Sequence, residues 1–167
     1  MKVPKRILVV GDAGLGKTTF AQRLSKKTGI PVYSTDDFFW KKKFTEPHNR
    51  EQSIVDISKI YNQDNWIVEG GTTHLVKEGI EKADEIYFLE PRNIFVQYLI
   101  LIKRSLSRPN EKLLDLFKFL RHLTYKRYGW GYKRGVTTLA DMLKPYENKI
   151  MRFYSHADKD RLINNIK

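Results

Sequence analysis

A short glycine-rich stretch near the amino terminus combines residue types that bind phosphate. It fits the spacing G-x-x-x-x-G-K-[ST], with Gly11, Gly16, Lys17 and Thr18 at the fixed positions. Glycines let the backbone turn sharply and bring its N–H groups close to an anion, while the N-terminus of the next helix adds a favourable dipole. Lysine can bridge the outer phosphates of a nucleoside triphosphate, and the threonine hydroxyl can ligate Mg²⁺. We therefore predict an ATP–Mg²⁺ site at Gly11, Asp12, Ala13, Gly14, Leu15, Gly16, Lys17, Thr18 and Thr19.

Two acidic residues directly follow apolar runs, in WIVE (66–69) and YFLE (87–90). An acid at the end of the strand beside the phosphate loop commonly holds Mg²⁺ through water. Glu69 is the favoured metal residue, because the two glycines after it leave space for a ligand. Glu90 is the second candidate. Either acid could instead cap the helix that follows it.

The segment STDDFFW (34–40) carries a second group of candidates, those for the phosphoryl acceptor. Asp36 could orient an attacking hydroxyl or take its proton. Phe39 and Trp40 could wall a pocket for a planar or apolar group. The alternative is that the acids cap a helix and the aromatic rings belong to the core.

Residues 103–134 are strongly basic and aromatic. Phosphoryl transfer requires cations on the equatorial oxygens, and Arg104 and Arg108 lie one helical turn apart, so both are candidate catalytic residues. The string YKRYGWGYKR (125–134) equally suits base stacking beside backbone phosphates, so nucleic acid is a candidate partner. A solvated basic helix is the third interpretation.

The elements that must position these residues follow from hydrophobic spacing. Buried strands are predicted at 7–10, 32–33, 66–68, 86–89 and 150–154, and helices at 17–27, 51–61, 75–82, 93–106, 136–144 and 158–166. Residues 41–50 are predicted to be a polar loop. Alternating strands and helices predict an α/β fold with a parallel sheet covered on both faces. The phosphate loop and the acids then meet at the carboxyl edge of the sheet.

Composition limits the class of protein. The chain has 167 residues, a formal net charge of +12 and no cysteine, which favours anionic partners and excludes disulfides and thiolate metal sites. The longest apolar run, 94–102, is far shorter than the roughly 20 residues of a membrane span. We expect a cytoplasmic protein without a membrane segment, and its oligomeric state stays open.

Four segments, taken in order, resemble a known family: GDAGLGKTT, IPVYSTDDFFW, NWIVEGG and KADEIYFLEPR. They are similar to the bacterial DNA topology modulation proteins, which are adenylate kinase-related kinases. That family is similar in turn to the shikimate, gluconate and nucleoside monophosphate kinases. The resemblance covers residues 6–105, and its most specific part is D-x-x-F-W at Asp36 to Trp40.

The resemblance implies a P-loop three-layer sandwich with strand order 2-3-1-4-5. It implies one domain over 1–167 with a basic helical lid inserted at about 106–135. By position, Asp36 matches the family's acid before an aromatic pair, and Arg92 its arginine after the fourth strand. Glu69 stands where relatives have Asp-Gly, which moves the carboxylate by one methylene. Pro91 directly after Glu90 departs from the usual spacing.

These observations predict an ATP-dependent kinase whose acceptor, a nucleotide or small hydroxyl compound, lies near Asp36, Phe39, Trp40 and Arg92. One alternative is a nucleic-acid-binding NTPase that affects DNA topology, or a kinase of polynucleotide ends. Another is a protein that uses ATP only as a conformational ligand.

Overall fold

The computed structural model describes residues 4–42, 46–90, 93–106, 116–118, 120–121, 123–124 and 138–166, apart from the side chains of Lys42 and Arg104. The chain divides into two compact units, one formed by 1–90 with 138–167 and the other by 91–137. Each unit is described by itself.

A parallel sheet forms the centre of the first unit. Its five strands lie in the order β2-β5-β1-β6-β7. Their bounds are β1 Arg6–Gly11, β2 Val32–Ser34, β5 Trp66–Gly70, β6 Glu85–Leu89 and β7 Ile150–Phe153. The strand order is the predicted one, and the α/β prediction is confirmed. Strand β5 is buried along its whole length, as expected for a strand covered on both faces.

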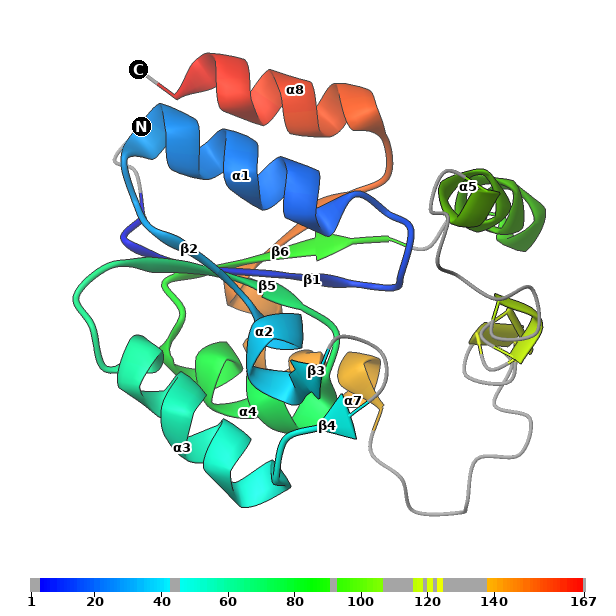
Figure 1. Cartoon of the computed structure of the whole chain (residues 1–167). Coiled ribbons are helices and arrows are strands. Elements are labelled where there is room, and N and C mark those ends of the chain that lie inside the picture. The colour runs from blue at the N-terminus through cyan, green and yellow to red at the C-terminus, as the bar shows by residue number, and fades with distance from the viewer. Residues whose placement is uncertain are drawn as a thin grey trace. The chain divides into compact units, whose positions relative to one another are not determined.

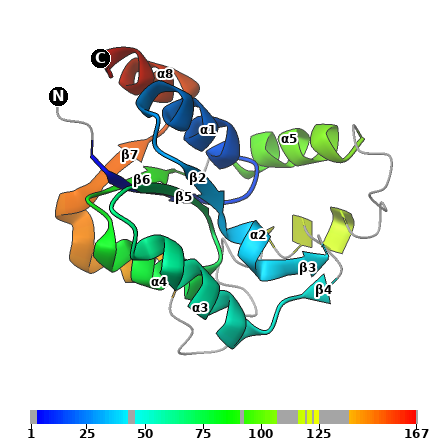
Figure 2. The ribbon, with the colours of Figure 1, turned by 60° about the vertical axis from the view of Figure 1, so that its left-hand side comes forward.

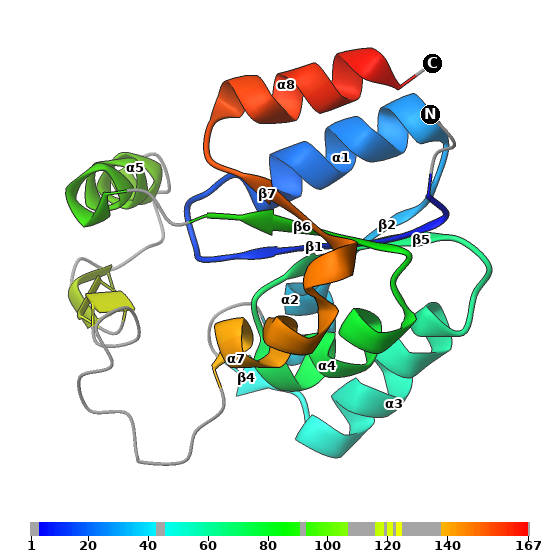
Figure 3. The same cartoon turned by 180° about the vertical axis from the view of Figure 1, so that it is seen from behind.

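Helices cover both faces of the sheet, which gives three layers (Figure 1). One face carries α1 (Lys17–Thr28) and α8 (His156–Asn165); the other carries α3 (Arg50–Tyr61), α4 (Thr73–Lys82) and α7 (Leu139–Leu143), as the reverse view in Figure 3 also shows. Each face has its own apolar core. Phe20, Leu24 and Leu162 belong to the core under α1 and α8, and Ile57 and Val76 to the opposite one.

The contact between α3 and α4 depends on a buried tyrosine. The Tyr61 hydroxyl donates to the Leu75 carbonyl at 2.9 Å. A Cβ built on Gly79 would lie 2.7 Å from the Tyr61 ring, so the glycine lets the two helices approach closely. Burial raises the pKa of Tyr61, with a further contribution from the charge of Glu78. The tyrosine is therefore neutral at ordinary pH.

The segment after β2 differs from the predicted loop over 41–50. Helix α2 (Thr35–Phe39) comes first, and β3 (Trp40–Lys42) then pairs antiparallel with β4 (Glu46–Pro47), as seen in Figure 2. The His48 N–H donates to the Phe39 carbonyl at 2.8 Å and closes the reversal. Strands this short carry too little alternation to be read from sequence.

The helix predicted at 136–144, directly after the predicted lid, also differs. Residues 136–137 lie outside the described part, and α7 is followed by a 3-10 helix, η1 (Lys144–Lys149), rather than continuing to Lys144 as an α-helix. Thr138 and Asp141 form a capping box at the start of α7. In α8, Ser155 and Asp158 form the same motif, so the helix begins at His156 instead of the predicted Asp158.

The second unit contains α5 (Ile94–Leu106), whose first turn is capped by Asn93 accepting from the Phe95 N–H at 2.9 Å. The Tyr98 hydroxyl contacts Thr124 and donates to the Leu120 carbonyl at 3.3 Å. The unit covers 91–137, a wider range than the predicted lid at 106–135, whose role stays a prediction. In the part of the chain that the structure describes, no helix has the length and apolar character needed to cross a membrane.

Candidate functional site

The loop between β1 and α1 has the backbone of an anion cradle. Gly14 and Gly16 both have φ of +80°, a region that favours glycine. Gly16 is the N-cap of α1, and no side chain caps this helix. Its first turn also contains no acidic residue. The positive end of α1 is thus open to an anion instead of being neutralised by the protein's own side chains.

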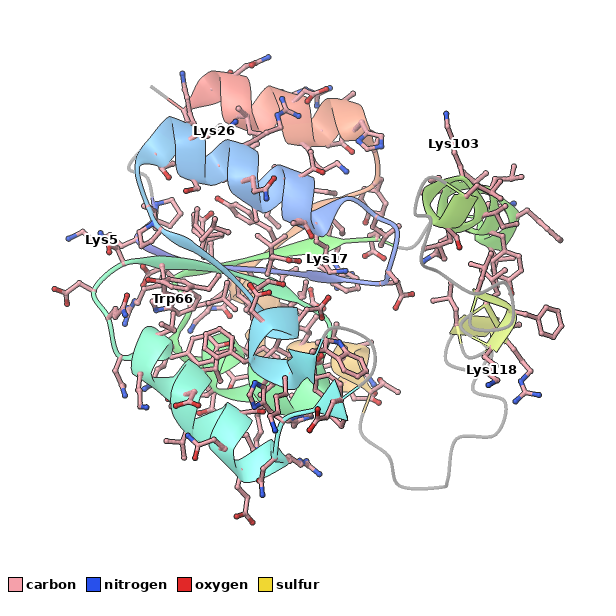
Figure 4. All side chains as sticks on the ribbon, viewed as in Figure 1. Lys5, Lys17, Lys26, Trp66, Lys103 and Lys118 are labelled. Atoms are coloured by element: carbon pink, nitrogen blue, oxygen red, sulfur yellow. The ribbon has the colours of Figure 1, made fainter. Side chains whose placement is uncertain are left out.

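Packing behind the loop fixes where it turns. A Cβ on Gly11 would lie 2.6 Å from the Leu89 carbonyl oxygen of β6, so this position needs glycine for close approach. Leu15 is buried in the core beneath α1. Lys17 bends back over the loop, and its Nζ donates to the Asp12 carbonyl at 2.9 Å. Figure 4 shows Lys17 at the start of α1. Its ammonium is therefore held at the loop.

Three elements converge on the carboxylate of Glu69. This side chain is only 4% exposed at the end of β5. Its Oε1 accepts a hydrogen bond from Thr18 Oγ1 at 3.0 Å and one from Ser34 Oγ at 2.7 Å. Because the Thr18 hydroxyl gives its proton to Glu69, its lone pairs stay available for a cation.

Glu90 has a different environment. It forms an ion pair with Arg152 of β7, and Arg152 also pairs with Glu147 at 2.6 Å. The bond to Glu90 raises the pKa of Arg152. In the sheet order, β6 lies two strands from β5, so Glu90 and Glu69 end different strands. The sequence left both acids open as metal residues, and only Glu69 is bonded to Thr18.

The oxygen set at Thr18 and Glu69 suits Mg²⁺, which keeps waters and shares phosphate oxygens instead of needing a protein cage. Within the described residues, no group of three or more His, Asp or Glu side chains is arranged to hold a metal ion. The Thr18 hydroxyl and the Glu69 carboxylate thus fit a Mg²⁺ ion that takes its other ligands from water or phosphate.

The Asp36 side chain lies in the first turn of α2 and is exposed. The Asp36 N–H donates to Ser34 Oγ at 3.3 Å, so Ser34 caps this helix while it also donates to Glu69. The alternative in which Asp36 itself caps the helix through its side chain does not apply, because Ser34 is the cap. Ser34 thus connects the Glu69 carboxylate to the helix that carries Asp36.

Phe39 and Trp40 pack edge to face, with ring centroids 4.7 Å apart, and both are half-buried. The Phe39 ring also lies 5.9 Å from the ring of His74, which sits in the first turn of α4. The His74 Nε2 atom is buried and makes no hydrogen bond with the described residues. Burial lowers the pKa of His74, and the positive charge of Arg50 lowers it further. His74 is therefore a neutral imidazole with an unused ring nitrogen.

Sequence reasoning assigned His74 no role. The histidine spacing shows no metal pattern, and nothing local marks the contact with Phe39 across 35 residues of chain. The only sequence signal is its position three residues after Gly71, shortly after the predicted strand and Glu69.

Three predicted arginines cannot be placed against the loop. Arg92 and Arg108 lie outside the described residues, and of Arg104 only the backbone, in α5, is described. Their roles stay predictions.

Comparison with known sequences gives partial matches. No family model matches the chain. An adenylate kinase from Anaeromyxobacter dehalogenans is 32% identical over 116 residues, which are 65% of this chain and 51% of that protein. An adenylate kinase from Clavibacter michiganensis is 35% identical over 81 residues, covering 47% of this chain and 38% of that protein. The chain thus spans about half, or less, of the length of these curated relatives.

Comparison with solved structures covers nearly the whole chain. A shikimate kinase from Bacteroides thetaiotaomicron aligns over 97% of this chain and 96% of its own with a TM-score of 0.59 at 14% identity. A gluconokinase from Sinorhizobium meliloti aligns over 99% and 97% with a TM-score of 0.56 at 15% identity. This chain has the P-loop kinase fold. The resemblance to DNA topology modulation proteins is not confirmed by these comparisons.

Proposed function

We propose that the protein is an ATP-dependent kinase that transfers a phosphoryl group to a small hydroxyl-bearing acceptor. The observation that carries this proposal is the pair of hydrogen bonds from Thr18 and Ser34 to the buried Glu69, beside an uncapped helix N-terminus. This arrangement joins the phosphate loop to the acid of the neighbouring strand. Through Ser34 it also joins that acid to α2, which carries two of the proposed acceptor residues, Asp36 and Phe39.

On the donor side, the amides of residues 11–19 and the Lys17 ammonium would bind the triphosphate of ATP. Thr18 and Glu69 would hold Mg²⁺, which supplies positive charge to the phosphate oxygens when bound. The 2.9 Å bond from Lys17 to Asp12 keeps the ammonium at the loop, so little rearrangement is needed when the anion arrives.

On the acceptor side, Asp36 is the proposed proton acceptor, because it is exposed and held near Glu69 through Ser34. Phe39, Trp40 and His74 provide an apolar wall with one buried ring nitrogen. The positive charge of Arg50, which contributes to lowering the pKa of His74, would favour an acceptor that carries an anionic group as well as a ring or apolar body. Arg92, Arg104 and Arg108 stay proposals for further cations.

The reaction follows from this placement. The acceptor oxygen attacks the γ-phosphorus while the bond from that phosphorus to the bridging oxygen of the diphosphate breaks, and the hydroxyl proton passes to Asp36. Catalysis consists of positioning and charge stabilisation, with no covalent enzyme intermediate.

The test is transfer of a labelled γ-phosphoryl group from ATP to a panel of nucleosides, nucleotides, small hydroxy acids and DNA ends. Lys17→Ala should abolish transfer with the fold intact, because the outer phosphates lose their main cation. Lys26→Ala, an exposed change in the last turn of α1, is the matched control and should retain activity. Equal rates for Lys17→Ala and the unchanged protein would refute the proposal.

A nucleic-acid-binding NTPase, or a kinase of polynucleotide ends, is the second candidate. It draws on the net charge of +12 and on the exposed Lys103, Lys118 and Arg121 of the second unit. The segment 125–134 that suggested base stacking lies outside the described residues. This candidate predicts DNA or RNA binding that weakens steeply with salt. Only millimolar affinity for DNA at physiological salt would end it.

A further inference from the structure

A buried lysine of α8 contacts the backbone of the phosphate loop. Lys159 belongs to α8 and is 5% exposed, and its Nζ donates to the Leu15 carbonyl oxygen at 3.1 Å. Lysine is rarely this buried, because moving an ammonium out of water is costly. Leu162 and Ile163 of the same helix pack in the apolar core. The Nζ atom of Lys159 connects this helix to the backbone of the phosphate loop.

The bond to Leu15 determines which way one peptide unit of the loop faces. No peptide bond among the described residues is cis, so the Leu15 C=O and the Gly16 N–H point in opposite directions across a planar unit. Holding the carbonyl toward α8 turns the Gly16 N–H away from α8. A Cβ built on Gly16 would lie 3.7 Å from Lys159 Nζ and 3.9 Å from His156 Cε1, so α8 lines this side of the loop. The opposite side is left for the anion.

We propose that Lys159 is a positioning residue for the nucleotide phosphates, an inference that rests on the proposed function. Its hydrogen bond fixes the Leu15–Gly16 peptide with the N–H directed to the phosphate, and a charged donor makes that bond stronger than a neutral one. The ammonium also adds positive charge on the α8 side of the phosphate loop. Because it is buried, salt screens this charge less than it screens the charge of a surface lysine. Lys17 binds the anion from the front, and Lys159 orients the loop from behind.

The experiment compares variants by calorimetric titration with magnesium ATP and with inorganic tripolyphosphate, which reports on the loop alone. Lys159→Met keeps the length of the side chain but removes its charge and donors. Lys159→Arg keeps both. Lys26→Met makes the same change in net charge at an exposed position near the far end of α1, as labelled in Figure 4.

We expect Lys159→Met to weaken binding of both probes by about tenfold, the loss typical of one hydrogen bond to a charged group. Lys159→Arg should recover most of the affinity, and Lys26→Met should bind within about twofold of the unchanged protein. This loss of affinity should be measurable well below the melting temperature of the ligand-free Lys159→Met protein, where the variant is folded. A purely structural lysine would instead lower the melting temperature and spare the affinity.

Carbon-13 and nitrogen-15 chemical shifts of Leu15 and Gly16 in the ligand-free protein give a second readout. Lys159→Met should move the Leu15 carbonyl resonance upfield, and Lys26→Met should leave it in place. Should Lys159→Met not fold, Lys159→Gln, which keeps a donor without charge, carries the same comparison. Equal affinity in the unchanged and Lys159→Met proteins would overturn this inference alone. Absence of binding by the unchanged protein would overturn the proposed function with it.

Discussion

At the scale of single residues, an experiment can decide whether Glu69 or Glu90 supports Mg²⁺ binding. Glu69→Gln removes the carboxylate that accepts from Thr18 and Ser34 but keeps its shape. We expect phosphoryl transfer to fall about 10- to 100-fold, with a higher Mg²⁺ requirement, as for other residues that support a metal. Initial rates across a Mg²⁺ titration measure this. Glu90→Gln, which loses an ion pair with Arg152, should leave the Mg²⁺ requirement unchanged. A reversed pattern would assign the metal to Glu90.

His74 gives the fold a dependence on pH. Its pKa lies below the value of about 6.5 of an unperturbed histidine, because of burial and the Arg50 charge. Between these two values the unfolded chain binds more protons than the folded one. His74 therefore costs the fold no stability above about pH 6.5. The free energy of unfolding decreases as the pH falls below that value, because the unfolded chain takes up the proton more readily. Urea unfolding at pH 7.5 and 5.5 should show a larger loss of stability for the unchanged protein than for His74→Gln. Parallel losses would contradict the neutral imidazole.

The significance of His74 and of Lys159 could not be read from sequence. Each is defined by a contact with a residue far along the chain, Phe39 in one case and Leu15 in the other. The phosphate loop could be predicted because its motif lies within nine consecutive residues, 11–19. The prediction of Glu69 as a metal residue, which stays a prediction, used only the strand before it and the glycines after it. Its bonds to Thr18 and Ser34 could be found only in the structure.

At the scale of elements, the close packing of α3 on α4 predicts a cost for a larger residue at position 79. Gly79→Ala places a methyl group 2.7 Å from the Tyr61 ring. Overpacking should destabilise by about 1 to 3 kcal/mol, outweighing a gain in helix propensity of up to about 1 kcal/mol. Chemical denaturation measures the difference.

The control for this prediction lies in the same helix. Glu81→Ala, at an exposed position of α4, should change stability by less than about 0.5 kcal/mol. If Gly79→Ala proved as stable as Glu81→Ala, the contact between the two helices would be looser than the structure has it.

The predicted strands are marked by their own residues, whereas the missed hairpin depends on contacts between two segments. The five parallel strands were found because each is a short, mostly apolar run, and their order followed from the family resemblance. The hairpin of β3 and β4 was missed because the lysines at 41–43 and Pro47 are typical of a loop. Its pairing is set by the chain reversal that the His48–Phe39 hydrogen bond closes.

At the scale of the whole molecule, nucleotide binding should raise thermal stability. Magnesium ATP at about 100 times its dissociation constant adds about 2.7 kcal/mol to the free energy of unfolding. For a chain of this size that corresponds to an increase in melting temperature of roughly 5 to 10 °C. Differential scanning fluorimetry with and without nucleotide measures it. Lys17→Ala should show no such increase, and an equal increase in that variant would place the nucleotide elsewhere.

The single hydroxyl of Ser34 bears on how the acceptor of the proposed kinase could be altered. It donates to Glu69 and accepts from the Asp36 N–H. One hydroxyl therefore links the proposed ATP side of the site to the proposed acceptor side. Any replacement that remodels the start of α2 for a different acceptor also disturbs the carboxylate beside the phosphate loop. Under the proposed function, acceptor preference should therefore be easier to alter through Phe39, Trp40 and His74 than through Ser34 and the start of α2.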